Sequence, residues 1–272
     1  MSKILFFGDV FGKPGRAALK AAVAEFRASH NPDVIIANVE NLTHGKGVTE
    51  NALADLKELD IDCYTSGNHV FDKGQLSTNS FENNANLIRP ANYTTLDEDG
   101  SPVPGSGFYR FAKNGQQYLV INLNGMVFFE KQFPGEMKNP FFALDELLKQ
   151  EAQNGDIIIV DFHAEATSEK QGLGWYADGR VSLVVGTHTH VPTADSRILP
   201  GGTGYCTDAG FCGPLDSVIG VTPQNAINTF IEKDKFHFEV AESAKAVANA
   251  VYIETDGTKA IKIEKLSKQI DL

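Results

Sequence analysis

The sequence predicts an α/β protein assembled from parallel strand, helix, strand units. Continuous apolar runs, such as residues 4–7 and 34–39, are typical of strands that are buried on both faces. A segment with the apolar periodicity of a helix, residues 16–29, lies between these two runs. Because the same alternation continues along the chain, we expect a parallel sheet with crossover helices.

The amino-terminal part contains three predicted strands and two predicted helices. In chain order they occupy residues 4–7, 16–29, 34–39, 49–60 and 62–66. Leu19, Val23 and Phe26 form the apolar stripe of the first helix. Thr49 is placed to cap the second helix. Residues 74–118 are rich in Asn, Pro and Gly, and they predict an irregular connection with room for one hairpin.

The carboxyl-terminal part continues the alternation. Strands are predicted at residues 118–123, 157–163, 184–190 and 203–208, helices at 141–153 and from Thr222 onward, and a final hairpin around Asp256 and Gly257. Residues 167–170 either start a helix or shape access to a site. The aromatic- and Pro-containing stretch around residues 125–140 is a candidate lid or small lobe within a single domain that spans residues 1–272.

Composition restricts the classes of function. A formal net charge of −11 argues against a protein that coats nucleic acid non-specifically, because such a protein needs a basic surface to displace counterions. Three cysteines, Cys63, Cys206 and Cys212, are too few and too irregularly spaced for a disulfide framework. Neither a signal-peptide pattern nor a run of membrane-spanning length is present, so we expect a cytoplasmic protein.

Residues 184–190 end in two histidines that are two positions apart. In an extended backbone, side chains repeat with a period of two, so His188 and His190 would point the same way and Thr189 the opposite way. Such a pair can ligate one ion or two neighbouring ions. By itself the pattern also suits a pair of surface or core histidines.

Ligand-type side chains stand at the carboxyl ends of five predicted strands. They are Asp9, Glu40, Asn41, Asn68, His69, His163, His188 and His190. Open α/β sheets bind ligands beyond the carboxyl ends of their strands, so we expect these residues to meet in a metal site. Their oxygen and imidazole donors suit iron, manganese or zinc better than copper(I) or an iron–sulfur cluster.

The donors suffice for two ions if one carboxylate bridges them. Two metals ~3.5–4 Å apart stabilise both the attacking and the leaving oxygen of a phosphoryl displacement. A metal-bound hydroxide would also provide a nucleophile at neutral pH. The residues therefore predict a dinuclear site for phosphate ester chemistry.

The stretches that carry these residues resemble the ordered motifs of the calcineurin-like metallophosphoesterases. They resemble most closely the YmdB-like subfamily of bacterial phosphodiesterases, in residues 8–16, 40–41 with 44–47, 161–170 and 186–190. The resemblance covers essentially the whole chain. It implies a layered α/β/β/α sandwich, a dinuclear metal site, hydrolysis of 2′,3′-cyclic nucleotides, and iron as the metal.

The resemblance also implies individual roles. One ion would take Asp9, Glu40, Asn41 and His190, and the other would take Glu40, Asn68, His163 and His188. His69 would be the general acid or a phosphate-binding cation. Phe11 stands where the broad family has a metal-binding histidine, and the amide oxygen of Asn41 could replace that imidazole. Val70 stands where many relatives carry an acidic residue that orients the histidine, so the partner of His69 is unidentified.

Two alternatives from other classes stay open. The protein could retain metal for stability and act as a regulatory or scaffold protein through protein partners. It could also be a phosphomonoesterase of the same fold, because a fold and its metals do not specify the leaving group. The favoured partner is a small-molecule phosphodiester, without extended nucleic acid or membrane, and homo-oligomerisation is left open.

Overall fold

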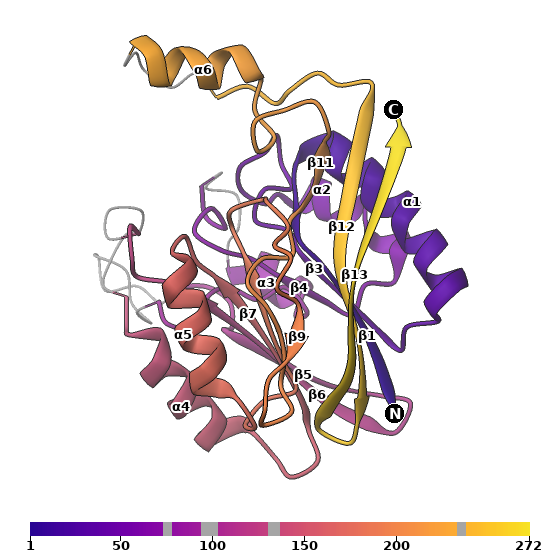
Figure 1. The fold of residues 1–272 in the computed structure, drawn as a ribbon, viewed down its shortest axis with the longest axis vertical. Coiled ribbons are helices and arrows are strands. Elements are labelled where there is room, and N and C mark those ends of the chain that lie inside the picture. Colours follow the sequence, from indigo (N-terminus) through magenta and orange to yellow (C-terminus); the bar gives the residue numbers. More distant parts are fainter. Residues whose placement is uncertain (73–77, 94–102, 130–136, 233–237) are drawn as a thin grey trace.

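The computed structural model describes residues 1–72, 78–93, 103–129, 137–232 and 238–272. In these residues the chain forms two β-sheets that pack face to face, with helices on both outer faces (Figure 1). The predicted α/β/β/α layering is therefore confirmed. Residues 130–136 of the candidate lid lie outside the described residues.

The first sheet contains both parallel and antiparallel pairs. Its strands in the described part of the chain are β1 (Ser2–Phe7), β2 (Asp9–Val10), β3 (Val34–Asn38), β4 (Cys63–Thr65), β11 (Phe211–Pro214), β12 (Lys245–Asp256) and β13 (Lys259–Asp271). Strands β1, β3 and β4 are parallel neighbours, and β12 returns antiparallel along β1. The hairpin predicted at Asp256 and Gly257 joins β12 to β13.

The second sheet has a parallel centre. Its described strands are β5 (Phe108–Lys113), β6 (Gln116–Asn124), β7 (Ile157–His163), β8 (Leu183–Thr187), β9 (Arg197–Ile198) and β10 (Gly204–Cys206). Strands β6, β7 and β8 run parallel, and β5 forms a hairpin with β6. Asn114 and Gly115 make the turn of this hairpin with φ values of 52° and 78°, as expected for a tight turn between strands.

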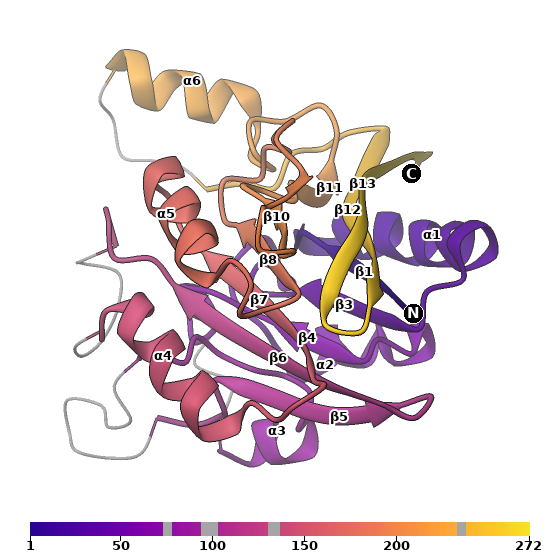
Figure 2. The same cartoon turned by 60° about the horizontal axis from the view of Figure 1, so that its bottom comes forward.

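Helices cover the outer face of each sheet. The helices in the described residues are α1 (Gly12–His30), α2 (Glu50–Ala54), α3 (Thr78–Asn83), α4 (Pro140–Glu151), α5 (Thr167–Ala177) and α6 (Pro223–Glu232), with a 3₁₀ turn at Lys57–Leu59. α1 lies against the first sheet, and α4 and α5 lie against the second, whereas α6 stands apart from both sheets (Figure 2). None of these helices has the length and apolar character that a membrane crossing requires.

Side-chain alternation along β1 explains why the layers form. Ile4 and Phe6 point into the core between the two sheets, where they join residues of β6, β7 and β8. Leu5 and Phe7 point to the opposite face, and the ring of Phe7 stacks on Phe26 of α1 at a centroid distance of 6.1 Å. A strand that is apolar on both faces is therefore buried between a helix and a second sheet.

Three predicted elements differ in the structure. α1 begins at Gly12 instead of residue 16, because Pro14 is tolerated in the first turn, where its missing N–H has no partner to lose. The helix predicted for residues 49–60 is capped by Thr49 as expected but gives way to a 3₁₀ turn after Ala54. Short helix α3 lies in the stretch that was predicted to be irregular.

The strands that carry the predicted ligands belong to both sheets. Asp9, Glu40 and Asn68 follow β1, β3 and β4 of the first sheet, whereas His163 ends β7 and His188 follows β8 of the second. The two sheets bring the carboxyl ends of these strands to one place. The site is therefore shared between the sheets.

Candidate metal centre

The side chains that the sequence predicted to meet lie together around a cavity of about 550 Å³. The predicted residues that line this cavity are Glu40, Asn41, His69, His188 and His190. Asp9, Asn68 and His163 complete the set, and all three are buried. The structure thus brings together every residue that the sequence proposed for the site.

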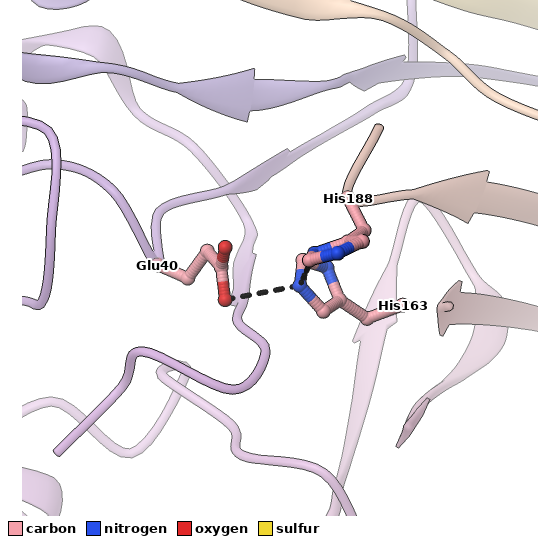
Figure 3. Close-up of side chains that lie close together, drawn as sticks. All are labelled: Glu40, His163 and His188. Carbon is pink, nitrogen blue, oxygen red and sulfur yellow. Dashed lines mark hydrogen bonds and ion pairs between the residues drawn. The ribbon is translucent and has the colours of Figure 1, made fainter. Parts of the chain in front are cut away.

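One group of ligand-type atoms surrounds Nε2 of His163. This nitrogen lies 2.9 Å from Oδ1 of Asn68 and 3.0 Å from Oε2 of Glu40. It also lies 3.1 Å from Nδ1 of His188. Figure 3 shows Glu40, His163 and His188 pointing toward one another, and their ligand atoms all lie within 4.8 Å of one another.

Hydrogen bonds on the far side of these rings set their tautomers. Thr187 donates its hydroxyl proton to Oδ1 of Asp161 at 2.7 Å, so its oxygen accepts from Nδ1 of His163 at 2.9 Å. Nε2 of His188 lies 3.0 Å from the Glu165 carboxylate. Each ring therefore turns an unprotonated nitrogen toward the site, as metal-ligating histidines do.

All four converging atoms are hydrogen-bond acceptors. Burial lowers the pKa of His163 to about 4 against the opposing charge of Glu40, so the ring is neutral near pH 7. Two imidazole lone pairs, a carboxylate oxygen and an amide oxygen repel one another unless a cation lies among them. Their mixed nitrogen and oxygen chemistry fits manganese, iron or zinc.

A second group includes His190, Asn41 and Asp9. Nε2 of His190 lies 3.1 Å from Nδ2 of Asn41 and 3.9 Å from Oδ1 of Asp9. Nδ1 of His190 donates to the carbonyl of Ile219 at 2.7 Å, which leaves Nε2 as the acceptor. Asn41 donates from its amide nitrogen here, so a ligand role requires that the amide turn its oxygen inward.

The carboxylate of Asp9 is the clearest sign that a cation fits this site. The residue is fully buried, and its Oδ1 has no hydrogen-bond partner among the described residues. Oδ2 accepts the backbone N–H of His188 at 3.1 Å. Burial, together with the charges of Glu40 and Asp208, raises the pKa of Asp9 well above its ordinary value. A bound cation would stabilise the ionised form instead.

Glu40 contacts both groups with different oxygens. Oε2 faces His163, while Oε1 accepts the side-chain amide of Asn41 at 2.9 Å. Oε2 also accepts the backbone N–H of His69 at 3.1 Å. Burial alone would raise the pKa of Glu40, but the neighbouring histidines, His163 first, hold it well below its ordinary value. A carboxylate in this position can serve ions in both groups.

The backbone of His188 and His190 differs from the prediction of an extended strand. β8 ends at Thr187, and the two histidines have φ values of 99° and 65°. Thr189 does not point away from the site: it lines the cavity, and its hydroxyl donates to Oδ2 of Asp208 at 2.7 Å. Positive φ is uncommon outside glycine and persists only where the surroundings hold it.

A buried ion pair holds this loop in place. Nζ of Lys170 in α5 lies 2.7 Å from Oδ2 of Asp208, and neither side chain is exposed to solvent by more than 2%. The same oxygen accepts the backbone N–H of Thr189 at 3.2 Å. Lys170 and Asp208 are 38 residues apart, so the sequence had no local signal for the pair.

The structure identifies the orienting partner of His69. Nδ1 of His69 lies 2.7 Å from Oδ2 of Asp72, three residues later, and Nζ of Lys46 lies 3.0 Å from the same oxygen. Burial alone would lower the pKa of His69, but the hydrogen bond to Asp72 and the charge of Glu40 raise it. Sequence reasoning considered only the adjacent Val70 and missed Asp72.

Phe11 packs against a candidate ligand and has no ligand atom of its own. Its buried ring meets the ring of His190 edge to face at a centroid distance of 5.5 Å. Phe211 stacks on the same imidazole at 5.2 Å with an interplanar angle of 5°. These two rings limit the motion of His190, and their apolar surfaces explain in part why burial lowers its pKa.

Comparisons with known proteins show the family of the chain. A family model described as YmdB-like protein matches residues 5–266. The 2′,3′-cyclic-nucleotide 2′-phosphodiesterase of Bacillus subtilis (strain 168) is 43% identical over 265 residues, which cover 97% of this chain and 96% of the relative. The crystal structure of a phosphatase from Mycoplasma pneumoniae has a TM-score of 0.89 and 38% identity, with 100% of this chain and 95% of that chain covered.

A more distant structure shows the fold alone. The calcineurin-like phosphoesterase YfkN from Bacillus subtilis has a TM-score of 0.59 at 13% identity, with coverage of 98% of this chain and 90% of that chain. The fold is similar to that of this calcineurin-like phosphoesterase, and the more similar relatives define a metal-dependent phosphoesterase. Within this class, the chain belongs to the YmdB-like family, as the resemblance of its motifs implied.

Proposed function

We propose that the protein is a dinuclear metal-dependent phosphodiesterase that hydrolyses 2′,3′-cyclic nucleotides. The observation that carries the proposal is the convergence of acceptor atoms from Glu40, Asn68, His163 and His188 beside the unpaired oxygen of Asp9. The Bacillus subtilis relative is named a 2′,3′-cyclic-nucleotide 2′-phosphodiesterase, and this name supports the choice of substrate class.

The proposed ligands form two sets that share Glu40. The first set is Asp9, Glu40, Asn41 and His190, and the second is Glu40, Asn68, His163 and His188. When bound, two such ions would lower the pKa of water and stabilise the oxygens of an in-line phosphoryl displacement. Iron is the proposed metal, and the same donors also accept manganese or zinc.

His69 is the proposed general acid. It lines the same cavity as His188, and Asp72 fixes the orientation of its ring. In the reaction, a water oxygen bonds to phosphorus, and the bond from phosphorus to one ribose oxygen breaks. His69 gives its proton to that ribose oxygen. A proton released by the attacking water then restores the protonated form of His69. The product is a nucleoside monophosphate.

Two further features belong to the proposal. The substrate is a small-molecule phosphodiester instead of an extended nucleic acid, because the cavity lies among residues of an acidic chain with a net charge of −11. We also propose a cytoplasmic location.

A substrate panel tests the proposed activity. Fully metallated protein is assayed with 2′,3′-cyclic AMP, bis-p-nitrophenyl phosphate and p-nitrophenyl phosphate, and its metal content is measured in parallel. Turnover of the cyclic nucleotide with the highest kcat/KM supports the proposal. Preference for the monoester would make the protein a phosphomonoesterase, and no turnover by metal-loaded protein would favour the regulatory or scaffold function.

A variant pair tests the general acid. His69→Ala should slow turnover by ~10²–10⁴-fold, the contribution typical of a positioned acid, while the metal content stays at the wild-type level. His44→Ala is the matched control, because His44 is exposed in a neighbouring loop. Loss of bound metal in His69→Ala would show that His69 is a ligand.

A further inference from the structure

The cavity beside the metal centre is lined by two chemically different sets of residues. One set, here called the polar end, carries the acceptor groups described above, and the other, here called the apolar end, consists of Phe11, Ile219, Val221 and Phe238. The volume of about 550 Å³ falls within the roughly 300–1,000 Å³ of sites for small organic ligands. A cyclic phosphate bound at the polar end would leave the rest of a nucleotide to occupy this volume.

The apolar end exposes large side chains to solvent. Ile219 is 50% exposed and Phe238 is 42% exposed, and both line the same cavity as the metal-site residues. Phe11 lies behind them, with its ring 5.9 Å from that of Phe238. Large apolar side chains that are solvent-exposed at the mouth of a cavity are typical of a surface that a ligand covers.

The backbone holds this surface at a fixed position relative to the metal centre. The segments before and after α6 pair with each other: the N–H of Thr222 donates to the carbonyl of Glu239 at 3.0 Å, and the N–H of Ala241 donates to that of Gly220 at 2.9 Å. Ile219 has a φ of 49°, which is strained for a β-branched residue. In this conformation its carbonyl accepts a hydrogen bond from Nδ1 of His190, and the half-exposed residue lines the cavity.

We infer that Phe238 and Ile219 form a subsite for the nucleobase of the substrate. This inference rests on the proposed function, because it places the cyclic phosphate at the metal centre and the base at the apolar end. A planar base can stack on the ring of Phe238 and contact the aliphatic side chain of Ile219. Neither side chain has a hydrogen-bonding group, so the subsite distinguishes a nucleotide from a base-free sugar phosphate and selects weakly among bases.

The test compares substrates that differ only in the base. Wild-type protein and Phe238→Ala are assayed with 2′,3′-cyclic AMP and with methyl β-D-ribofuranoside 2,3-cyclic phosphate, which has no base. Stacking on an aromatic residue is worth enough to change binding by roughly 5- to 100-fold. For each protein we take the ratio of kcat/KM for the nucleotide to kcat/KM for the base-free substrate. In Phe238→Ala we expect this ratio to fall by this factor, because KM for the nucleotide rises.

A matched control and a second variant keep the test decisive. Phe230→Ala removes the same side chain from α6 at a position that is 81% exposed and outside the cavity lining, so the ratio should stay at the wild-type value. Ile219→Ala truncates the second contact but retains the carbonyl that His190 needs, and it should lower the ratio by a smaller factor.

The outcomes separate the subsite from the proposed function. Turnover of both substrates by wild-type protein, with an unchanged ratio in Phe238→Ala, would refute the subsite and leave the phosphodiesterase proposal intact. An equal loss for both substrates would also refute it, because Phe238 would then act on the phosphate end. If metal-loaded wild-type protein cleaved neither substrate, the proposed function would fail and the subsite with it.

Discussion

The carboxylate of Asp72 lies 2.7 Å from Nδ1 of His69, across one short turn after β4. This contact fixes the orientation of the imidazole and favours its protonated form, because it raises the pKa of His69 against the opposing effect of burial. Lys46 contacts the same carboxylate and keeps it ionised, since the pKa of Asp72 is lowered against burial by both partners. An acidic residue three positions away thus orients the proposed acid.

Asp72→Asn should slow turnover without loss of metal. The amide keeps the size of the side chain but removes the charge that favours protonated His69, so kcat should fall by about 10-fold or more, yet less than the ~10²–10⁴-fold expected for loss of the acid itself. Steady-state kinetics and metal analysis check this outcome. If the double variant Asp72→Asn with His69→Ala were much slower than His69→Ala alone, Asp72 would act independently of His69.

Glu40→Ala should reduce bound metal to fewer than two ions per chain and abolish activity. Glu40 is the only proposed ligand shared by both sets, and its two oxygens face different groups of the site. Metal analysis after gel filtration gives the number of ions per chain. Glu58→Ala is the matched control, because Glu58 is exposed on the 3₁₀ turn. Two tightly bound ions in Glu40→Ala would refute the bridging role.

Gly67→Ala should damage the metal centre although it changes no ligand. A Cβ at Gly67 would lie 2.3 Å from Oε2 of Glu40 and 2.3 Å from Nε2 of His163, so both side chains would have to move. We expect weaker metal binding and a loss of activity, measured by titration of manganese into metal-free protein. Gly172→Ala in α5 is the control, because its nearest neighbour would lie at an ordinary 3.5 Å. Wild-type metal affinity in Gly67→Ala would contradict the packing argument.

Lys170→Met should lower the free energy of unfolding by about 3–5 kcal/mol, because it leaves the carboxylate of Asp208 buried without its cation. The substitution retains most of the side-chain volume, so the decrease in the free energy of unfolding reflects the lost charge. Urea unfolding measures this free energy. Arg180→Met is the matched control: the ion pair of Arg180 with Asp145 is on the surface, where such pairs contribute about 0–1 kcal/mol. Equal decreases in the free energy of unfolding of the two variants would show that the buried ion pair contributes no more to stability than the surface pair.

Local patterns were sufficient for most of the fold. The apolar runs at residues 4–7, 34–39 and 157–163 form β1, β3 and β7, because burial of both faces requires continuous apolar sequence. Boundaries were less predictable near glycine and proline, as the early start of α1 at Gly12 shows. Glycine and proline, which often indicate a loop in a sequence, can also occupy the first turn of a helix.

The proposed ligands could be found from the sequence because each follows a recognisable strand. The residues that orient these ligands could not be found from the sequence. Glu165, Asp208 and Ile219 carry no local pattern, and they reach His188, Thr189 and His190 only through tertiary contacts. The side-chain alternation predicted for the two histidines failed for the same reason, since their backbone conformation depends on a buried ion pair far away in the sequence.

The sequence by itself determined which side chains stand at the ends of buried strands, because strand burial and ligand chemistry are properties of short segments. Only the tertiary structure decided how those ends meet. Two sheets place Glu40 of the first beside His163 and His188 of the second, and the loop after β8 adopts positive φ because Lys170 and Asp208 hold Thr189. Contacts between distant segments set these positions, and no local pattern encodes them.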